Sequence, residues 1–166
     1  MIAHSTGTVA GVAVSPKYQS AIAKMQSFKQ RQAPFLLLAD SMHTALSQAR
    51  YISPALRKLA KSAWPGGVTL VFGAKKALSK ACYQRGRIAV RVDDDSETRR
   101  LARFCGGLLL SSSFNRKGQE SLALTHQNRM RFYRHLDAGL YAHSMENTGC
   151  ASAIYDVSRS KISQLR

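Results

Sequence analysis

The chain has 166 residues, a length that fits one domain with a substantial buried core. Hydrophobic residues make up 45% of the chain, which excludes an intrinsically disordered protein. Its 25 Lys and Arg residues outnumber its 9 Asp and Glu residues, and the formal net charge of +16 predicts anionic partners, with nucleic acid first and nucleotide phosphates second.

Short apolar runs alternate with helical patterns along the chain, which is typical of an α/β (mixed α+β) fold. We expect a single domain over residues 1–166. Six segments have the composition of strands, namely residues 9–14, 35–39, 68–73, 87–92, 107–112 and 152–157. Helices are expected between them, at residues 16–31, 40–50, 53–64 and 95–107.

Capping signals stand at the start of each expected helix. Ser15 precedes a proline, and Asp40 and Ser53 also occupy positions where an N-terminal cap is expected. The acidic run at 93–95 follows a strand, so capping of the 95–107 helix explains it better than metal binding does.

The composition and the cysteines also limit where the protein can be located and which cofactors it can hold. Apolar runs such as residues 35–39 are far too short to cross a bilayer, and no segment has the pattern of a secretory signal. We therefore expect a cytoplasmic protein without membrane contact. Cys82, Cys105 and Cys150 are odd in number and far apart, which indicates reduced thiols. Neither the cysteines nor the 5 histidines show ligand spacing, so no metal site is predicted.

Two features could hold an anion. Lys29 and Arg31 end the first expected helix. Cations at this position either interact favourably with the negative end of the helix dipole or bind phosphate and carboxylate groups. The 107–112 strand runs into Ser113 and Asn115, which either satisfy turn backbone or donate hydrogen bonds to a nucleotide. Ligands gather at strand ends in α/β sheets, but these patterns alone leave both interpretations open.

The order of the segments resembles the YrdC-like enzymes, which make threonylcarbamoyl-adenylate for tRNA modification. That family has a Pro-Thr-Glu-Thr/Ala-Val-Tyr-Gly-Leu-Gly segment, then Lys-x-Arg, Trp-Pro-Gly-Pro-Val-Thr-Phe, Ala-Val-Arg-Val, Ser-Thr-Ser-Ala-Asn and Gly-x-x-Pro-Ser-Thr-Ile-x-Asp. The matching stretches here are STGTVAGVA (5–13), KQR (29–31), WPGGVTLVF (64–72), IAVRVDDD (88–95), SSSFN (111–115) and GCASAIYD (149–156). These six stretches keep the family's order and span almost the whole chain.

This resemblance implies a twisted mixed sheet flanked by helices around a basic concave cavity. It implies an enzyme that joins L-threonine, bicarbonate and ATP, with Mg²⁺, for threonylcarbamoyladenosine modification of tRNA, and it implies other tRNA-modification proteins as partners. By matching position, the chemistry is assigned to Lys29, Arg31 and Thr6. The other implied ligand-binding residues, which would line the same cavity, are Thr8, Arg91, Ser111, Ser113, Asn115 and Ser152.

Departures from the family pattern motivate an alternative. Gly7 and Ala10 stand where the family has Glu and Tyr, Phe114 stands where it has a small residue, and no second lysine follows Arg31. The alternative is a catalytically altered relative that binds RNA, either tRNA or double-stranded RNA, through its basic cavity. The charge alone is also compatible with a basic structural subunit of a ribonucleoprotein.

Overall fold

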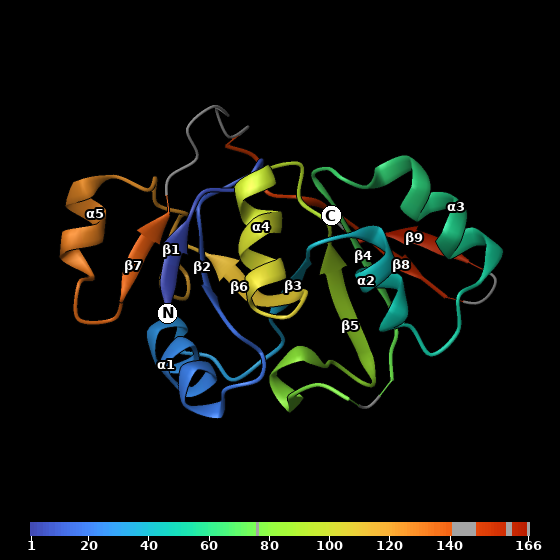
Figure 1. Ribbon diagram of the computed structural model, residues 1–166, viewed down its shortest axis with the longest axis horizontal. Helices are drawn as coiled ribbons and strands as arrows, with labels where there is room; N and C mark the ends of the chain where they lie inside the picture. Colours follow the sequence, from blue (N-terminus) through green and yellow to red (C-terminus); the bar gives the residue numbers. More distant parts are fainter. Residues whose placement is uncertain (76, 141–148, 159–160, 166) are drawn as a thin grey trace.

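The computed structural model describes residues 1–75, 77–140, 149–158 and 161–165, and its strands form a 9-stranded sheet in the order β7-β1-β2-β6-β3-β5-β4-β8-β9 (Figure 1). The strands are β1 (Ile2–His4), β2 (Gly11–Val14), β3 (Leu36–Ala39), β4 (Val68–Gly73), β5 (Arg87–Arg91), β6 (Leu108–Ser113), β7 (Ala138–Leu140), β8 (Ala153–Val157) and β9 (Ile162–Gln164). The helices are α1 (Gln19–Lys29), α2 (Met42–Ser47), α3 (Pro54–Ala63), α4 (Ser96–Phe104), α5 (His126–Arg131) and the 3₁₀ turn η1 (Lys80–Cys82).

The sheet is mixed. The pairs β1–β7, β3–β5 and β4–β8 are parallel, whereas β1–β2, β2–β6, β3–β6, β4–β5 and β8–β9 are antiparallel. The β7 strand and α5 lie at one end of the molecule, and β8 and β9 lie at the other (Figure 1). The expected fold class, a mixed sheet flanked by helices, is confirmed.

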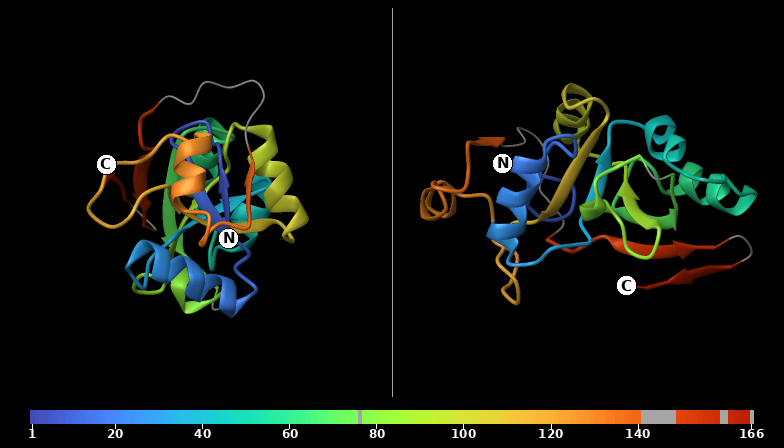
Figure 2. Two further views of the ribbon diagram at one scale, coloured as in Figure 1. Left: turned by 90° about the vertical axis from the view of Figure 1, so that its left-hand side faces the viewer. Right: turned by 90° about the horizontal axis from the view of Figure 1, so that it is seen from below.

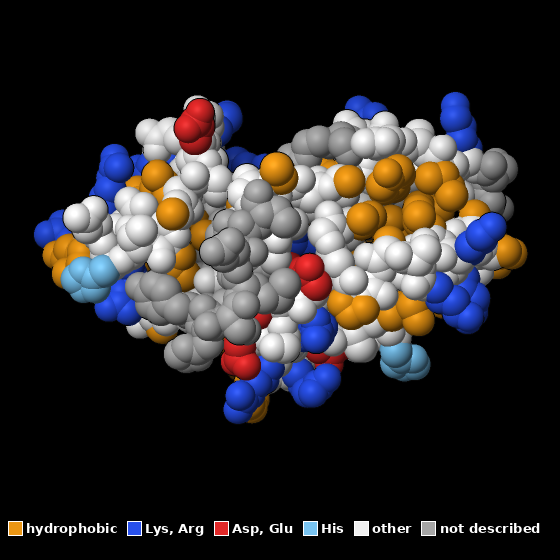
Figure 3. All heavy atoms as spheres, turned by 90° about the horizontal axis from the view of Figure 1, so that it is seen from above, with side chains coloured by type: hydrophobic (Ala, Val, Ile, Leu, Met, Phe, Trp, Pro, Cys, Tyr) orange, Lys and Arg blue, Asp and Glu red, His pale blue; other side chains and the backbone are white. Residues whose placement is uncertain are grey.

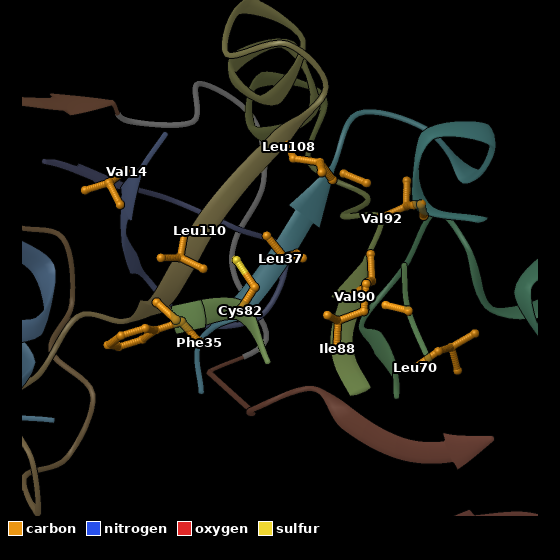
Figure 4. Close-up of a cluster of buried hydrophobic side chains, with 14 of the residues drawn as sticks. Val14, Phe35, Leu37, Leu70, Cys82, Ile88, Val90, Val92, Leu108 and Leu110 are labelled. Atoms are coloured by element: carbon orange, nitrogen blue, oxygen red, sulfur yellow. The ribbon is translucent and has the colours of Figure 1, made fainter. Parts of the chain in front are cut away.

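Strand alternation sorts the side chains between the two faces of the sheet, because successive residues of a strand point in opposite directions. One face carries the main core, and Figure 4 shows some of its strand side chains, such as Leu37, Val90 and Leu110. Helices α1, α2 and α3 also contribute to this core. Its central strand residues include Val12, Val14, Leu37, Leu70, Val90 and Leu110. The opposite face carries a smaller cluster in which Ala13, Leu38 and Leu109 pack against Ala102 of α4. Helices α1 and α4 therefore lie on opposite sides of the sheet (Figure 2).

The predicted strands are all present, with ends that differ from the prediction by at most two residues. Strands β1, β7 and β9 were not predicted because each has only three residues, too few to show alternation. Helix α5 was not predicted either, and none of its residues is buried, so no apolar stripe marks it.

The predicted helices are present, but two of the predicted caps are wrong. Helix α1 begins only at Gln19, beyond Ser15, and no side chain caps it. Helix α2 is capped by Ser41, whose hydroxyl accepts from the backbone N–H of Thr44, and not by Asp40. Ser53 and Asp95 do cap α3 and α4, as predicted.

Two further expectations concern thiols and membranes. All three cysteines lie in the described part of the chain, and none of them is part of a disulfide. No helix within the described ranges is long and apolar enough to span a bilayer. Lys and Arg side chains are spread over both ends of the face seen in Figure 3, and Asp and Glu side chains are few there.

Candidate functional site

A cavity of about 390 Å³ opens on the α4 side of the sheet, and it is lined by residues of β2, β3, β4, β5, β6 and β8. Ser111 and Ser113 point into it because they alternate with Leu110 and so share the face of Leu109. Seven of the nine predicted site residues line this cavity, namely Thr6, Thr8, Arg31, Arg91, Ser111, Ser113 and Ser152. The fold therefore brings together residues from segments that lie far apart in the sequence.

The other two predicted residues, Lys29 and Asn115, lie behind the cavity wall and not among its lining residues. The Lys29 ammonium group donates to the Ser113 carbonyl at 2.8 Å, and to the Asn115 carbonyl and Asn115 Oδ1 at 2.5 Å each. These three bonds use all three N–H groups of the lysine. Burial, and then the charge of Arg31, lower the pKa of Lys29 to about 8. In this arrangement Lys29 holds the exit of β6 in place.

Arg31 is exposed on the cavity rim, two residues beyond the end of α1. Its guanidinium carbon lies 4.7 Å from the centroid of the Phe35 ring, and Nη2 donates to the Ser112 hydroxyl at 3.2 Å. Stacking on an aromatic ring fixes the guanidinium while leaving most of its N–H groups free to donate. Arg31 is thus the lining residue best placed to meet an anion.

Thr6, Thr8 and Arg91 form a directed hydrogen-bond chain. Arg91 Nη1 donates to Thr8 Oγ1 at 2.5 Å, and Thr6 Oγ1 donates to the Val9 carbonyl at 2.8 Å. Because the single hydroxyl proton of Thr6 is used in that bond, the 3.1 Å contact between the two threonine hydroxyls must have Thr8 as its donor. The Thr8 backbone N–H also donates to Thr6 Oγ1 at 3.1 Å, so the hydroxyl of Thr6 is fully used within the protein, whereas Thr8 keeps one lone pair for the cavity.

Arg91 is itself held by Asp93, and the two side chains form a buried ion pair. Burial lowers the pKa of Arg91 and raises that of Asp93, and the attraction between the two charges opposes both effects. Asp93 Oδ1 also accepts from the backbone N–H groups of Gly7 at 2.9 Å and Asp95 at 3.0 Å. The acidic run therefore has two structural roles, since Asp93 orients Arg91 and Asp95 caps α4.

His4 is a polar residue beside the site that the sequence did not single out. It is fully buried on β1, with Nδ1 at 2.9 Å from the Ser5 carbonyl and Nε2 at 3.2 Å from the Ser111 hydroxyl. Burial lowers the pKa of His4 to about 4, so the ring is neutral at neutral pH. A lone histidine in a three-residue strand gives no spacing signal that could have indicated this contact.

Two residues that depart from the family pattern, Ala10 and Phe114, lie next to each other. The Phe114 N–H donates to the Ala10 carbonyl at 2.8 Å, which extends the β2–β6 register by one pair. Both side chains belong to the main core, and the Phe114 ring contacts Phe28 and Phe132 and does not enter the cavity. The large residue at position 114 therefore fills space beside the small residue at position 10.

Gly7 has a similar explanation. A Cβ atom at this position would lie 1.8 Å from Oδ1 of Asp94, so the Asp94 carboxylate occupies the space where a longer side chain would begin. Glycine at position 7 therefore leaves room for the Asp94 side chain, which is exposed and does not line the cavity.

The donor set of the cavity suits an anion better than a bare metal ion. Its charged lining residues among the described part of the chain are Arg31 and Arg91, with no carboxylate. No group of three or more His, Cys, Asp or Glu side chains that could hold a metal occurs within the described residues. An arginine pair and strand-end hydroxyls in a cavity of this size are typical of an α/β protein that binds a small anionic ligand.

Comparison with known proteins identifies the family. The Sua5/YciO/YrdC family model, described as "Telomere recombination", matches residues 1–166, so the chain belongs to this family. A threonylcarbamoyl-AMP synthase of Idiomarina loihiensis is 34% identical over 137 residues, which cover 80% of this chain and 74% of that protein. The enzyme of the same name from Chromobacterium violaceum is 32% identical over 135 residues, covering 80% and 70%.

Solved structures share the fold. P. abyssi Sua5 in complex with L-threonine has a TM-score of 0.88 and 22% identity, and the match covers 99% of this chain and 49% of that chain. E. coli YciO has a TM-score of 0.85 and 16% identity, with coverage of 99% and 81%. The chain therefore spans about half the length of the P. abyssi protein and most of YciO.

Proposed function

We propose that this chain is a threonylcarbamoyl-AMP synthase that joins L-threonine, bicarbonate and ATP. The observation that carries this proposal is the cavity itself, which combines Arg31 and Arg91 with the hydroxyls of Thr6, Thr8 and Ser111. The names of relatives that are 34% and 32% identical over 80% of this chain support the same activity. Its product would serve threonylcarbamoyladenosine modification of tRNA in the cytoplasm, together with other tRNA-modification proteins.

The proposed reaction has two bond-forming steps. The amino group of threonine adds to the carbon of bicarbonate, and water is lost, which gives a carbamate. A carbamate oxygen then attacks the α-phosphorus of ATP, so that a new P–O bond forms while the bond to pyrophosphate breaks. Holding both reactants in one cavity favours this attack, and Arg31 and Arg91 would stabilise the negative charge around phosphorus.

Mg²⁺ would enter this site with the nucleotide. The ion prefers carboxylate and phosphate oxygens, and the described lining residues include no carboxylate. The ATP phosphates would therefore hold the ion, and bound there it would neutralise phosphate charge. The protein contributes arginine donors, while Lys29 keeps the wall that carries Ser113 in place.

The test is pyrophosphate release from ATP by the purified protein. We expect release only when both L-threonine and bicarbonate are present, and about a hundredfold loss in Arg31→Ala. Arg57→Ala, which removes an exposed arginine from α3 outside the cavity, is the matched control and should retain full activity. Release that does not depend on threonine, or equal activity in the two variants, would contradict the proposal.

RNA binding is a second candidate function, and a different part of the surface favours it. Only two arginines line the main cavity in the described chain, and one of them is paired with Asp93. Arginines gather instead around α5, where Arg131 and Arg134 are exposed beside Tyr133, whose side chain is 57% exposed. Cations that meet phosphates, next to a ring on which a base can stack, are the usual features of single-stranded RNA binding.

This candidate is tested by titrating single-stranded RNA and measuring fluorescence anisotropy. We expect the triple variant of Arg129, Arg131 and Arg134 to glutamine to weaken binding and to flatten its dependence on log salt. The matched control is the triple glutamine variant of the exposed α3 residues Arg57, Lys58 and Lys61, which removes the same charge from the other end of the molecule. Equal losses in the two variants would show only a general effect of charge.

A further inference from the structure

The His4–Ser111 contact has a defined direction. The Ser5 carbonyl can only accept, so the Nδ1 atom of His4, 2.9 Å away, must carry the ring proton. In the neutral ring Nε2 then has only a lone pair, and the Ser111 hydroxyl 3.2 Å away must donate to it. Ser111 is thereby left with lone pairs alone for any other partner.

The backbone leaves room for this contact. Gly11 pairs with β1 opposite His4, and a Cβ atom at Gly11 would lie 2.8 Å from His4 Nε2 and 3.2 Å from Ser111 Oγ. Glycine therefore lets the imidazole ring and the serine hydroxyl meet. Both Gly11 and Ser111 line the cavity, whereas His4 lies behind them.

The neighbouring polar groups define what can bind there. Thr8 also presents only lone pairs, because its proton goes to Thr6, whereas Arg31 and Arg91 present donors. With two arginines and no carboxylate in the described lining, a positively charged donor is disfavoured next to Ser111. A hydroxyl group fits this mixture, because it donates one hydrogen bond and accepts another.

We propose that His4 is a positioning residue that fixes Ser111 as an acceptor for a hydroxyl group of the bound ligand. This inference rests on the proposed function, which supplies two sources of such a hydroxyl. One is the ribose of the nucleotide, and the other is the side chain of L-threonine. A buried acceptor of this kind rejects a ligand that lacks the hydroxyl, since the acceptor is then left without a partner.

Calorimetry with matched ligand pairs tests the inference and separates the two sources. The pairs are ATP with 2′-deoxy-ATP, ATP with 3′-deoxy-ATP, and L-threonine with L-valine. We expect the wild-type protein to bind the hydroxyl-bearing member of one pair about tenfold more tightly. That preference should vanish in Ser111→Ala and His4→Phe, while affinity for the member without the hydroxyl stays the same.

The conservative variant distinguishes positioning from a structural role. In His4→Gln the side-chain carbonyl can take the place of Nε2 and accept from Ser111, so the ligand preference should return. No change in any ligand preference on mutation of Ser111 would overturn the inference. A Ser111-dependent preference for ATP over inosine triphosphate would also overturn it, because the ligand donor would then be an amino group.

A measurement on the free protein keeps the inference independent of the enzyme reaction. The ¹⁵N chemical shifts of the His4 ring at neutral pH should show a protonated Nδ1 and a Nε2 that accepts a hydrogen bond. A protonated Nε2 would make Ser111 a possible donor and would overturn the inference. If the wild-type protein binds neither ATP nor L-threonine, the proposed function fails, and the ring tautomer alone then decides the role of His4.

Discussion

Replacing His4 by glutamine should remove a specific sensitivity to acid. Burial lowers the pKa of His4 from 6.5 in the unfolded chain to about 4 in the folded protein. Between these values the unfolded chain binds a proton that the folded protein does not, so the free energy of unfolding falls as the pH falls. Above pH 6.5 the ring is neutral in both states, and this contribution to stability is fully present.

The size of the effect follows from the two pKa values. Their difference of about 2.5, at about 1.4 kcal/mol for each pH unit, corresponds to about 3 kcal/mol lost between pH 6.5 and about pH 4. Such a loss is a large part of the stability of a typical domain. It acts on a ring with 0% exposure, for which solvent screening is small.

Urea unfolding, repeated from about pH 4.5 to about pH 7.5, measures this dependence. The wild-type free energy of unfolding should decrease steeply with acid, and His4→Gln should lose most of that slope. The control is His43→Gln, which replaces an exposed histidine at the start of α2 and should keep the wild-type slope. The same slope in His4→Gln and in the wild type would refute the assignment of the neutral buried ring.

Three further predictions concern packing, the cavity wall and a helix cap. Phe114→Ala should lower the free energy of unfolding by about 3 kcal/mol or more, and adding Ala10→Tyr should recover at least about 1 kcal/mol of that loss, because the two side chains fill the same space. If urea unfolding shows that the effects of the two substitutions simply add, this prediction is contradicted. Lys29→Met should lower the free energy of unfolding by about 2 kcal/mol, because the Asn115 carbonyl loses its ammonium donor while the Ser113 carbonyl and Asn115 Oδ1 each lose one of two donors. A loss below about 1 kcal/mol would show that the ammonium bonds contribute little. Ser53→Ala should cost about 1 kcal/mol through loss of the α3 cap, whereas Ser62→Ala on the exposed side of the same helix should change thermal stability little; equal effects would argue against the cap.

The longer elements of the fold could be predicted from the sequence because each carries its own periodic signal. The 68–73 strand was predicted with its observed ends, and Ser53 and Asp95 were identified as caps from residue type and position. Strands β1 and β7 could not be predicted, because a strand of three residues shows no alternation. The two strands also pair with each other across a large sequence separation, Ile2 with Ala138, which no local pattern indicates.

The candidate site was predictable as a set of residues but not as a set of contacts. Arg31 and Ser111 do line one cavity, as the resemblance implied. Lys29 has the same motif signal as Arg31, yet the structure turns its ammonium group towards the β6 backbone. His4 was missed because its partner is 107 residues away in sequence, and only tertiary structure places it beside Ser111.

The direction of the hydrogen bonds is also beyond the reach of sequence. A serine or threonine hydroxyl can donate or accept, so residue type alone left Ser113 as a possible donor to a nucleotide. In the structure its proton goes to Asn115 Oδ1 at 2.7 Å, and those of Thr6 and Thr8 are also used within the protein. The hydroxyl wall therefore accepts hydrogen bonds, and Arg31 and Arg91 donate them.

The most direct test of the central claim is detection of the product itself. Purified protein incubated with ATP, L-threonine and ¹³C-bicarbonate should form threonylcarbamoyl-AMP that is heavier by one mass unit than the product made with unlabelled bicarbonate. Mass spectrometry should find this species with the wild-type protein and with Arg57→Ala, and far less of it with Arg31→Ala. Absence of the labelled product from the wild-type reaction, under conditions in which both ATP and L-threonine bind, would contradict the account.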